Sequence, residues 1–436
     1  MINGMLQSIL HKAEHYLGKV IVGHIKSHAH ECESCFTQLA KAQQTGEPVR
    51  KKIAIDRLLK SKSVKIAALI AELDSKVENL DEAIYQKLPG MNFKNDCDEP
   101  INTWAEPKDH HTPIGSAHIP YRQLCSYGLV RKARGWIVGR ILEILFPCHP
   151  SNFLSPGRGL QVLCDHIKKS AWGNKKFNSR FIIFDVKDFY PSVRQNQEVV
   201  ELLGLPEYLV RNDIFTSPTA PIALCGSLPH GVSKELFIGA ARQGLPQGKA
   251  TSSLVAGILY GRLLEQIAPA HRFFYYGDDG GIVCDEIDGE TIAIALRAGL
   301  QAHPFGPFQP KHCGIFGFEK GFNFAGYHYQ ITSFKDRIRI SPSLQSFKKL
   351  EGKIANIILT FPPAVWNEEI DRYVKHWLKA FPRWKETKNG MIKLQENIKT
   401  GRSLGMQKLN AKPKKPKVKI TILKNSSGTN AGTALN

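Results

Sequence analysis

The sequence lacks the features that mark membrane and secreted proteins. It contains no apolar run of about 18 residues, the length needed to cross a bilayer. Its first residues, MINGMLQSILHKAEHYL, mix charge into the apolar positions and contain no apolar signal-peptide core. The nine cysteines are odd in number and scattered, which favours reduced thiols over a disulfide framework. We therefore expect a cytoplasmic protein with no membrane partner.

Acidic residues are scarce relative to basic ones. The 436-residue chain has 59 Lys and Arg against 39 Asp and Glu, giving a net charge of +20. An excess of this size favours phosphate-rich polymers, so nucleic acid is a better expected partner than an anionic surface. With 42% apolar and 22% charged residues, the composition is that of a globular protein. Its length predicts roughly two to four folded units.

No internal repeat is present, and the hydrophobic pattern places helices at both ends of the chain with strands between them. Residues 1 to about 90 have helical spacing, and the Pro-, Asn- and His-rich stretch 91–120 predicts a loop or linker. Residues 341–405 predict basic helices. The Lys-Pro tail that begins at Lys412 predicts disorder. The expected fold class is α+β.

Two acidic positions lie at the ends of predicted strands. The apolar run 180–184 ends at Asp185, and a predicted β-hairpin over 273–284 has Asp278 and Asp279 at its tip. Adjacent carboxylates repel each other, and a divalent cation removes that cost. Mg²⁺ prefers such oxygen ligands together with substrate phosphates. Taken singly, each position is also explained as an ordinary turn.

A Gly- and Pro-containing loop lies between the two acidic positions. Its sequence, Gly244-Leu-Pro-Gln-Gly-Lys-Ala-Thr-Ser-Ser253, precedes a predicted helix over 252–267. Glycine allows close backbone approach to a flat ligand, and Gln247 offers both a donor and an acceptor. A helix N-terminus capped by Thr251 or Ser252 explains the same residues.

In this order, the three segments resemble the palm motifs of reverse transcriptases: the first Asp strand, the Leu-Pro-Gln-Gly loop, and Tyr-x-Asp-Asp. The segment Gly321-Phe-Asn-Phe-Ala-Gly-Tyr327 resembles the primer-grip hairpin. The segment Phe153-Leu-Ser-Pro-Gly-Arg-Gly159 resembles one of the bacterial, group II intron-like branch. Together the resemblance covers about residues 120–330, and the joint occurrence is more specific than any single motif.

The resemblance implies a right-hand polymerase that copies RNA into DNA on a primer, using deoxynucleotides and two Mg²⁺ ions, with Mn²⁺ as a possible substitute. The implied units are a helical extension (1–95), fingers (96–170), a palm (171–330), a helical thumb (331–410) and a basic tail (411–436).

The family also implies roles for matching residues. Catalytic metal ligands would be Asp185, Asp278 and Asp279, with the backbone carbonyl of Val186. Nucleotide-binding residues would be Tyr190, Gln247, Gly248, Arg122, Arg134 and Lys311. Primer or template contacts would be Gly326, Tyr327, Lys375 and Lys379. For the three nucleotide-binding cations, a solvated surface position is an equally good interpretation.

The sequence also departs from the family pattern. Tyr-Gly-Asp-Asp is common in viral RNA-dependent RNA polymerases, but those enzymes place Asp at the position of Tyr190 and Ser-Gly at Gln247-Gly248. Ala325 replaces the usual Leu of the primer grip. RNA synthesis, template-independent transfer and a non-catalytic RNA-binding scaffold remain alternatives.

No endonuclease, integrase or RNase H motif is found, which favours a stand-alone bacterial enzyme. Members of that branch serve in phage defence with a dedicated non-coding RNA, in retrons or in diversity generation. Defence is the preferred hypothesis.

Two further patterns are weaker. His28, His30, Cys32 and Cys35 have the spacing of half a zinc site, but no second compact cluster accompanies them, so a helix without metal is the better interpretation. In the segment 373–381, an amphipathic helix is expected to bury Val374, Trp377 and Leu378 while exposing Lys375 and Lys379.

Overall fold

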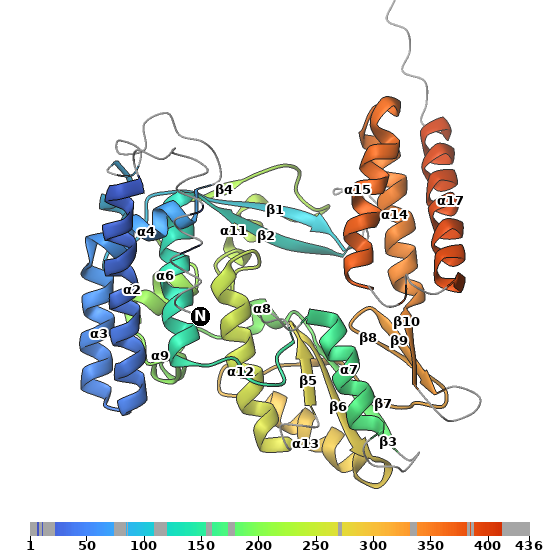
Figure 1. Cartoon of the computed structure of the whole chain (residues 1–436), viewed down its shortest axis with the longest axis horizontal. Coiled ribbons are helices and arrows are strands. Elements are labelled where there is room, and N and C mark those ends of the chain that lie inside the picture. Colours follow the sequence, from blue (N-terminus) through green and yellow to red (C-terminus); the bar gives the residue numbers. More distant parts are fainter. Residues whose placement is uncertain are drawn as a thin grey trace, which may run out of the picture.

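The computed structural model combines helices at both ends of the chain with three sheets between them (Figure 1). It describes residues 22–73, 86–108, 120–153, 159–172, 179–268, 273–331, 338–381 and 388–411, with Gln7, His11, Ile84 and Trp384 as isolated positions. The predicted α+β class is confirmed. The basic tail lies outside the described residues, as does most of the segment 153–159. The boundaries of fingers, palm and thumb remain a prediction.

Three N-terminal helices form the blue layer of Figure 1. They are α2 (Val22–Thr45), α3 (Pro48–Lys60) and α4 (Lys62–Ala71). Pro48 suits the first turn of α3, where its missing N–H has no helical partner. Ser61 ends α3, and its hydroxyl caps α4 by accepting from the Val64 amide. The predicted helical character of this region is confirmed for the described residues.

A small sheet crosses the upper middle of Figure 1. Its strands lie in the order β2 (Tyr121–Tyr127), β1 (Ile101–Pro107), β4 (Ile222–Leu224). The prediction of a loop or linker over 91–120 is therefore wrong for β1. Residues of β1 alternate between buried and half-buried positions, which is the period of a half-buried strand. The Pro and Asn content of the flanking residues masked that short alternation.

The central sheet has the order β5-β6-β3-β7, all antiparallel. Its strands are β3 (Ser179–Val186), β5 (Phe273–Tyr276), β6 (Asp279–Asp285) and β7 (Pro310–Gly317). Helices α12 (Ala250–Ile267), α13 (Gly289–Gln301) and α7 (Gly159–Trp172) pack beside it (Figure 1). The predicted strand before Asp185, the hairpin and the helix α12 are confirmed.

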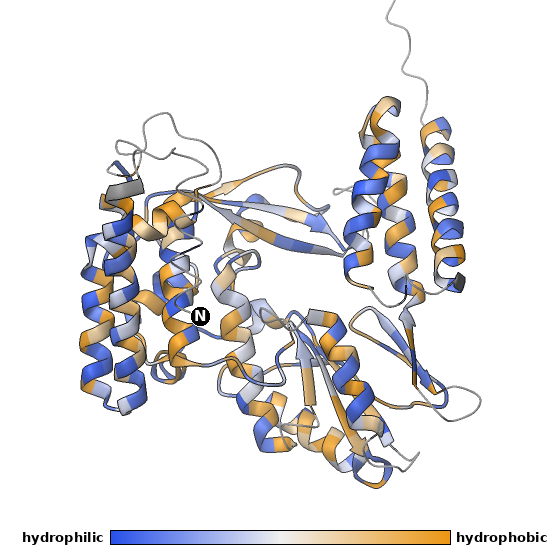
Figure 2. Ribbon diagram, viewed as in Figure 1, coloured by the Kyte–Doolittle hydropathy of each residue, from blue (hydrophilic) through white to orange (hydrophobic). Residues whose placement is uncertain are grey.

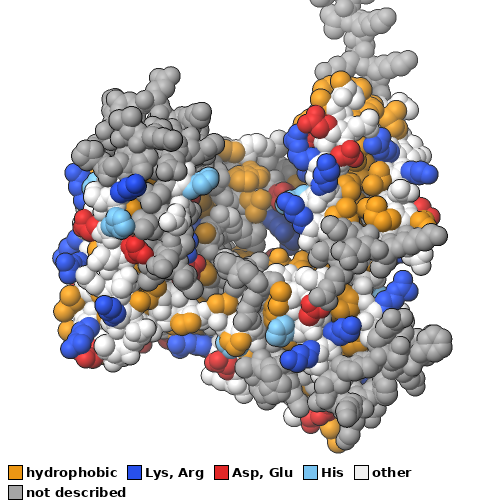
Figure 3. All heavy atoms as spheres, in the orientation of Figure 1, with side chains coloured by type: hydrophobic (Ala, Val, Ile, Leu, Met, Phe, Trp, Pro, Cys, Tyr) orange, Lys and Arg blue, Asp and Glu red, His pale blue; other side chains and the backbone are white. Residues whose placement is uncertain are grey.

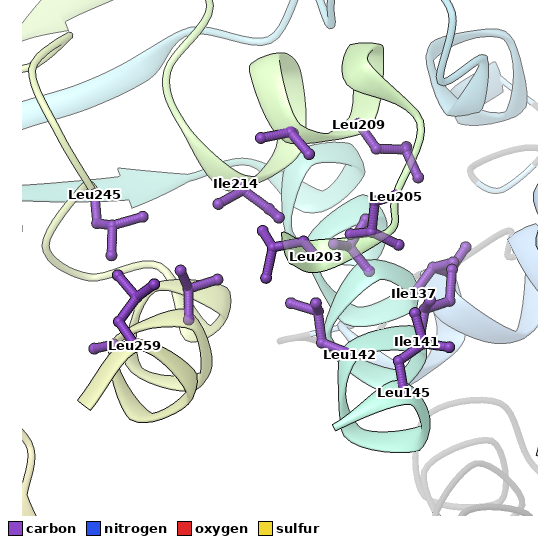
Figure 4. Close-up of a cluster of buried hydrophobic side chains, with 14 of the residues drawn as sticks. Ile137, Ile141, Leu142, Leu145, Leu203, Leu205, Leu209, Ile214, Leu245 and Leu259 are labelled. Atoms are coloured by element: carbon purple, nitrogen blue, oxygen red, sulfur yellow. The ribbon is translucent and has the colours of Figure 1, made fainter. Parts of the chain in front are cut away.

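The largest core joins the N-terminal helices to the central sheet through α6 (Leu129–Leu145). Figure 4 shows Ile137, Ile141 and Leu145 one below another on α6, with Leu205 and Leu209 of the segment that follows β3 in the same cluster. Burying each such side chain contributes roughly 1.5–3 kcal/mol. In Figure 2, hydrophobic and hydrophilic residues alternate along the helices, as expected of helices that bury one face.

Several short helical elements lie between β3 and α12 in the chain. They are α8 (Phe189–Ser192), α9 (Gln197–Leu203), α10 (Glu207–Leu209), a π-helical turn (Val210–Ile214) and α11 (Lys234–Ala240).

The C-terminal part begins with a three-stranded sheet and continues as helices. The strands are β8 (Phe322–Phe324), β9 (Tyr327–Ile331) and β10 (Ile338–Pro342), and the helices are α14 (Leu344–Thr360), α15 (Trp366–Lys379) and α17 (Lys388–Ala411). On α15, Val374 is buried, Trp377 and Leu378 are half-buried, and Lys375 and Lys379 are exposed, as predicted. Among the described residues, no helix is both long and apolar enough to cross a bilayer.

Candidate active site

Two carboxylates face each other across neighbouring strands at one end of the central sheet, and a third lies in the adjoining turn. Asp185 on β3 is the direct cross-strand partner of Asp279 on β6, and Asp278 precedes Asp279 in the hairpin turn. Residues opposite each other in an antiparallel pair have Cβ atoms about 4.5–5.5 Å apart. The structure therefore brings Asp185 and Asp279, which are far apart in sequence, next to each other. Their catalytic role remains a prediction.

Glycine and aromatic packing fixes this register. A Cβ atom on Gly280 would lie 1.9 Å from the Phe184 ring, and one on Gly281 would lie 2.4 Å from the Phe181 ring. The two rings therefore cross directly over the β6 backbone, which only glycine permits. Both aromatic residues are fully buried on β3. The Asp-Asp-Gly-Gly sequence thus places its carboxylates while its glycines make room for the neighbouring strand.

The electrostatic environment of Asp279 is unfavourable to its charge. Burial, followed by the charges of Asp278 and Asp185, raises the pKa of Asp279 to about 6. Lys349 and Lys311 oppose this shift. Burial and the two neighbouring carboxylates thus disfavour the charged form of Asp279 more than the two lysines favour it. A bound cation would favour the charged form.

Lys311 on β7 forms an ion pair with Asp185. Its Nζ lies 2.9 Å from Asp185 Oδ2, and the two side chains are 65% and 27% exposed. The hydrogen bond to Asp185 and the charge of that carboxylate raise the pKa of Lys311. The sequence predicted a nucleotide-binding role for Lys311. The structure places it at the candidate site, next to one of the three carboxylates.

The donor type fits a divalent cation, because carboxylate oxygens are the ligands that Mg²⁺ prefers. Within the described parts of the chain, however, no group of three or more His, Cys, Asp or Glu side chains is arranged to hold a metal ion. Lys311 takes one Asp185 oxygen. The three carboxylates would therefore have to turn toward one another to ligate a shared ion. Val186, whose carbonyl was predicted as a further ligand, has a buried side chain at a register shift between β3 and β7.

Tyr190 lies at the edge of the cluster on α8. Its ring is half-buried and packs edge-on against Phe189, with ring centroids 5.5 Å apart. Burial and the charge of Asp278 raise the pKa of Tyr190 to about 12. The phenol is therefore neutral at ordinary pH, and it presents bulk rather than charge.

The Gly-Leu-Pro-Gln-Gly loop is held between Tyr190 and β2. The amide of Leu245 donates to the Tyr190 carbonyl, and the amide of Cys125 donates to the Gln247 carbonyl, both at 2.8 Å. Gly248 has φ +105°, and a Cβ there would lie 2.2 Å from the Cys125 carbonyl oxygen. Glycine is required by both conformation and space. The half-exposed Gln247 side chain thus sits on a rigid loop beside Tyr190.

The prediction that Arg134 binds nucleotide is wrong. Arg134 is 1% exposed, and its guanidinium forms two 2.8 Å bonds with the carboxylate of Asp213. It also donates to backbone carbonyls of the loop 90–95, including those of Gly90 and Asn95. Because its donors face the interior, none is presented to a ligand. Arg122, the other predicted cation, is exposed on β2, and its role remains a prediction.

The prediction that Tyr327 contacts primer or template is also wrong for its side chain. Tyr327 is 3% exposed, packs against Phe381 and donates its hydroxyl proton to the Ala380 carbonyl. The Gly326 carbonyl accepts from the Ser343 amide and the Ser346 hydroxyl at the start of α14. The hairpin of β8 and β9 therefore anchors the C-terminal helices.

The cysteine and histidine pattern on α2 is part of the core. Cys32 and Cys35 are buried, and His28 Nδ1 lies 2.8 Å from the Ser63 hydroxyl. Burial raises the pKa of Cys32 to about 12, so this thiol is protonated in the metal-free protein. These observations favour the interpretation as a helix without metal.

Two further residues belong to the site, and the sequence did not predict them. Tyr260 on α12 is buried beneath the hairpin and donates to the Asp278 carbonyl at 3.3 Å. Lys349 on α14 is exposed and lies near enough to lower the pKa of Asp279. The helical period places Tyr260 on the buried face of α12, but no local signal places Lys349 near a hairpin far from it in sequence.

A hollow opens in the middle of the face shown in Figure 3. Several Lys and Arg side chains lie along its right side, where the C-terminal helices lie in Figure 1, and hydrophobic side chains are visible behind them. The positive surroundings suit a phosphate-rich ligand.

No protein-family model matches the sequence, and no curated protein sequence matches it. Two solved structures share a distant likeness. The RNA-dependent RNA polymerase of a human picobirnavirus has 13% identity and a TM-score of 0.43, over 70% of this chain and 57% of that one. A telomerase from Candida albicans, in complex with a fragment of telomeric RNA, has 12% identity and a TM-score of 0.32, over 77% of this chain and 66% of that one. This chain thus spans less than two thirds of either structure. At TM-scores below 0.5, neither likeness establishes a shared fold.

Proposed function

We propose that this chain is a template-directed nucleotidyltransferase that extends a primer 3′-hydroxyl, and that it copies RNA into DNA. The observation that carries the proposal is the cross-strand pairing of Asp185 with Asp279 beside Asp278. The half-buried Tyr190 and the rigid loop at Gln247 lie next to this cluster. The combination matches the motif order on which the resemblance to reverse transcriptases rests.

In this proposal, Asp185, Asp278 and Asp279 hold two Mg²⁺ ions, with the Val186 carbonyl as a further ligand. When bound, such ions activate the attacking hydroxyl and stabilise the leaving pyrophosphate. Lys311 orients Asp185 in the absence of ligand and offers its remaining N–H groups to substrate phosphates. Gln247 and Gly248 form one wall for the incoming nucleotide. Base identity comes from pairing with the template, while basic surfaces hold the backbone.

The choice of DNA over RNA product is assigned to Tyr190. Its neutral ring, backed by Phe189, would occupy the space that a ribose 2′-hydroxyl needs. RNA synthesis is the alternative, and a Tyr190→Ala variant distinguishes the two. We expect the wild type to prefer deoxynucleotides and the variant to incorporate ribonucleotides more readily. Unchanged sugar selectivity in the variant would remove Tyr190 from this role.

The central experiment is primer extension on an RNA template with Mg²⁺, comparing the wild type with Asp185→Asn and with Asp278→Asn/Asp279→Asn. We expect the wild type to extend the primer and both variants to lose at least about 10³-fold, because each removes ligand charge from the cluster. A matched control, Asp288→Asn, changes an exposed carboxylate outside the site. Retained activity in Asp185→Asn would contradict the proposal. Sequencing the products separates templated from template-independent synthesis.

We extend the proposal to phage defence with a dedicated RNA, an extension that rests on the sequence resemblance alone. Cells carrying the chain with its own flanking RNA would be challenged with phage, beside cells carrying Asp278→Ala/Asp279→Ala. Loss of protection only in the variant would support defence by synthesis. Full protection in the variant would contradict it.

A further inference from the structure

A large cavity lies away from the carboxylate cluster, between the N-terminal helices and the segment 201–208. Its volume is about 1020 Å³, at the upper end of the range for ligand sites. Helix α3 forms one wall, the loop 92–94 a second, and the residues from the end of α9 to Tyr208 a third. None of the residues assigned above to the candidate active site lines it.

The charge of this cavity is strongly positive. Its lining includes two carboxylates, Asp56 and Glu201, and six cations: Lys51, Lys52, Lys60, Lys65, Lys94 and Arg262. Among the described residues, no carboxylate lies within salt-bridge distance of any of these six, although other basic side chains of the chain do form ion pairs. Six cations around a cavity that has only two carboxylates, neither of them paired in the described structure with a cation of the lining, repel one another, and an anionic ligand would relieve that repulsion.

One of these cations is partly removed from water. Lys65, on α4, is half-buried. Burial, and then the charge of Arg134, lowers its pKa. A half-buried ammonium without a carboxylate partner is costly in the ligand-free protein, and phosphate oxygens would supply the missing partner.

Flat apolar surfaces accompany the charge. Tyr208 is half-buried in the wall, and Phe146 lies under Arg262 with the guanidinium carbon 5.9 Å from its ring centroid. Lysines that hold phosphates, combined with aromatic rings in the wall of the site, are the means by which proteins bind nucleotide units without reading their sequence.

We propose that this cavity, here called the basic pocket, binds the phosphates and one or more bases of a nucleotide ligand. The ligand is either a segment of single-stranded RNA or a free nucleoside triphosphate. The proposal concerns a site distinct from the carboxylate cluster, and it stands whether or not the chain is a polymerase. It gives the N-terminal helices, which lie outside the family resemblance, a ligand of their own.

The test compares two charge-reversal variants in a background that lacks the candidate active site, Asp278→Ala/Asp279→Ala. The pocket variant is Lys52→Glu/Lys94→Glu, which changes exposed residues on two different walls. The matched control is Lys26→Glu/Lys41→Glu, which makes the same change in charge at exposed positions of α2 outside the pocket. Circular dichroism melting checks that all proteins are folded. The neutral pair Lys52→Gln/Lys94→Gln is a milder second variant.

Binding is measured by fluorescence anisotropy with a labelled single-stranded RNA and, separately, with a fluorescent ATP analogue, over a range of salt. If the ligand is RNA, the pocket variant should bind it roughly tenfold more weakly than the control. The magnitude of its salt slope should fall by about 0.7 for each phosphate that the variant no longer neutralises. If the ligand is a free triphosphate, the same difference should appear with the ATP analogue. Photo-crosslinks of the bound ligand should map to peptides covering 48–60 or 201–208.

Equal binding of both ligands by the pocket and control variants would overturn the proposal. So would equal losses in both, because general charge would then explain the effect. Neither result depends on primer extension, so failure of the basic pocket and failure of the proposed polymerase activity remain distinguishable.

Discussion

Two ion pairs of nearly equal length have opposite environments in this molecule. Arg134 and Asp213 are 2.8 Å apart with side chains 1% and 5% exposed, whereas Lys311 and Asp185 are 2.9 Å apart with side chains 65% and 27% exposed. Both cations resemble nucleotide-binding residues in the sequence. Burial separates them, because a ligand can reach only the second pair.

The two pairs also differ in how their donors are used. The planar guanidinium of Arg134 is shared between Asp213 and the carbonyls of the loop 90–95, so it ties α6 to two other segments. The described structure gives the Lys311 ammonium one acceptor, Asp185, and leaves the group facing solvent. The Arg134–Asp213 pair therefore stabilises the fold. In the Lys311–Asp185 pair, a ligand can reach the ammonium and replace Asp185 as its acceptor.

The largest expected effect is on stability. Replacing Arg134 with Ala should cost about 3–5 kcal/mol of unfolding free energy, because it leaves Asp213 buried without a partner and several carbonyls without donors. Urea unfolding measures this loss. Arg122→Ala, which removes an exposed guanidinium from β2, is the control and should change the free energy by less than about 0.5 kcal/mol. A loss below about 1 kcal/mol for Arg134→Ala would show that the buried pair is not structural.

The next effect should appear in activity. Replacing Lys311 with Ala should leave the unfolding free energy within about 1 kcal/mol of the wild type, as for other exposed pairs. Primer extension should fall by about 10²-fold, equivalent to about 2.7 kcal/mol in the barrier, because a positioned cation is lost beside the reacting phosphates.

Lys311→Arg, which keeps the charge, should retain more activity than Lys311→Ala. Full activity in Lys311→Ala, with stability unchanged, would show that the Lys311–Asp185 pair has no function. The two ion pairs would then differ in burial and in their contribution to stability, but not in a role in activity.

The sequence predicted the parts of the site that local rules determine. An apolar strand that stops at Asp185, and a hairpin whose tip carries Asp278, follow from patterns a few residues long. The pairing of Asp185 with Asp279 could be expected from the family resemblance, but its physical cause is the fit of the Phe184 and Phe181 rings over Gly280 and Gly281. This packing depends on residues of both strands, so it cannot be predicted from either strand alone.

The failures share a physical origin. Arg134 lies in a helix whose pattern does not reveal that its partner, Asp213, comes from a distant π-helical turn. Tyr327 is polar at one end, and its hydroxyl finds a carbonyl at residue 380, beyond the reach of any motif. The strand β1 gains stability from β2 and β4, which follow it later in the chain. In each case a long-range partner decided the outcome.

The smallest expected effect concerns the burial of Asp279 and its repulsion by Asp278 and Asp185. The pKa of Asp279 is raised to about 6, so the folded state holds this proton more tightly than the unfolded chain does. The associated stability is fully present below the ordinary carboxyl pKa of about 4 and is lost as pH rises through about 6. Without divalent cations, Asp279→Asn should therefore raise the melting temperature at pH 7.5 by roughly 1 °C, the shift expected for about 1 kcal/mol in a chain of 436 residues.

At pH 4 the difference between Asp279→Asn and the wild type should vanish, because the wild-type carboxyl is then largely protonated. Added Mg²⁺ should raise the melting temperature of the wild type at pH 7.5 more than that of the variant, since the ion offsets the repulsion that the variant has already lost. Thermal scans at the two pH values, with Mg²⁺ or with a chelator, measure both effects. A variant that is less stable than the wild type at pH 7.5 would mean that Lys311 and Lys349 already neutralise the cluster. The Lys311–Asp185 pair would then resemble the Arg134–Asp213 pair, because its charges would already be balanced. The carboxylate cluster would not need a bound cation.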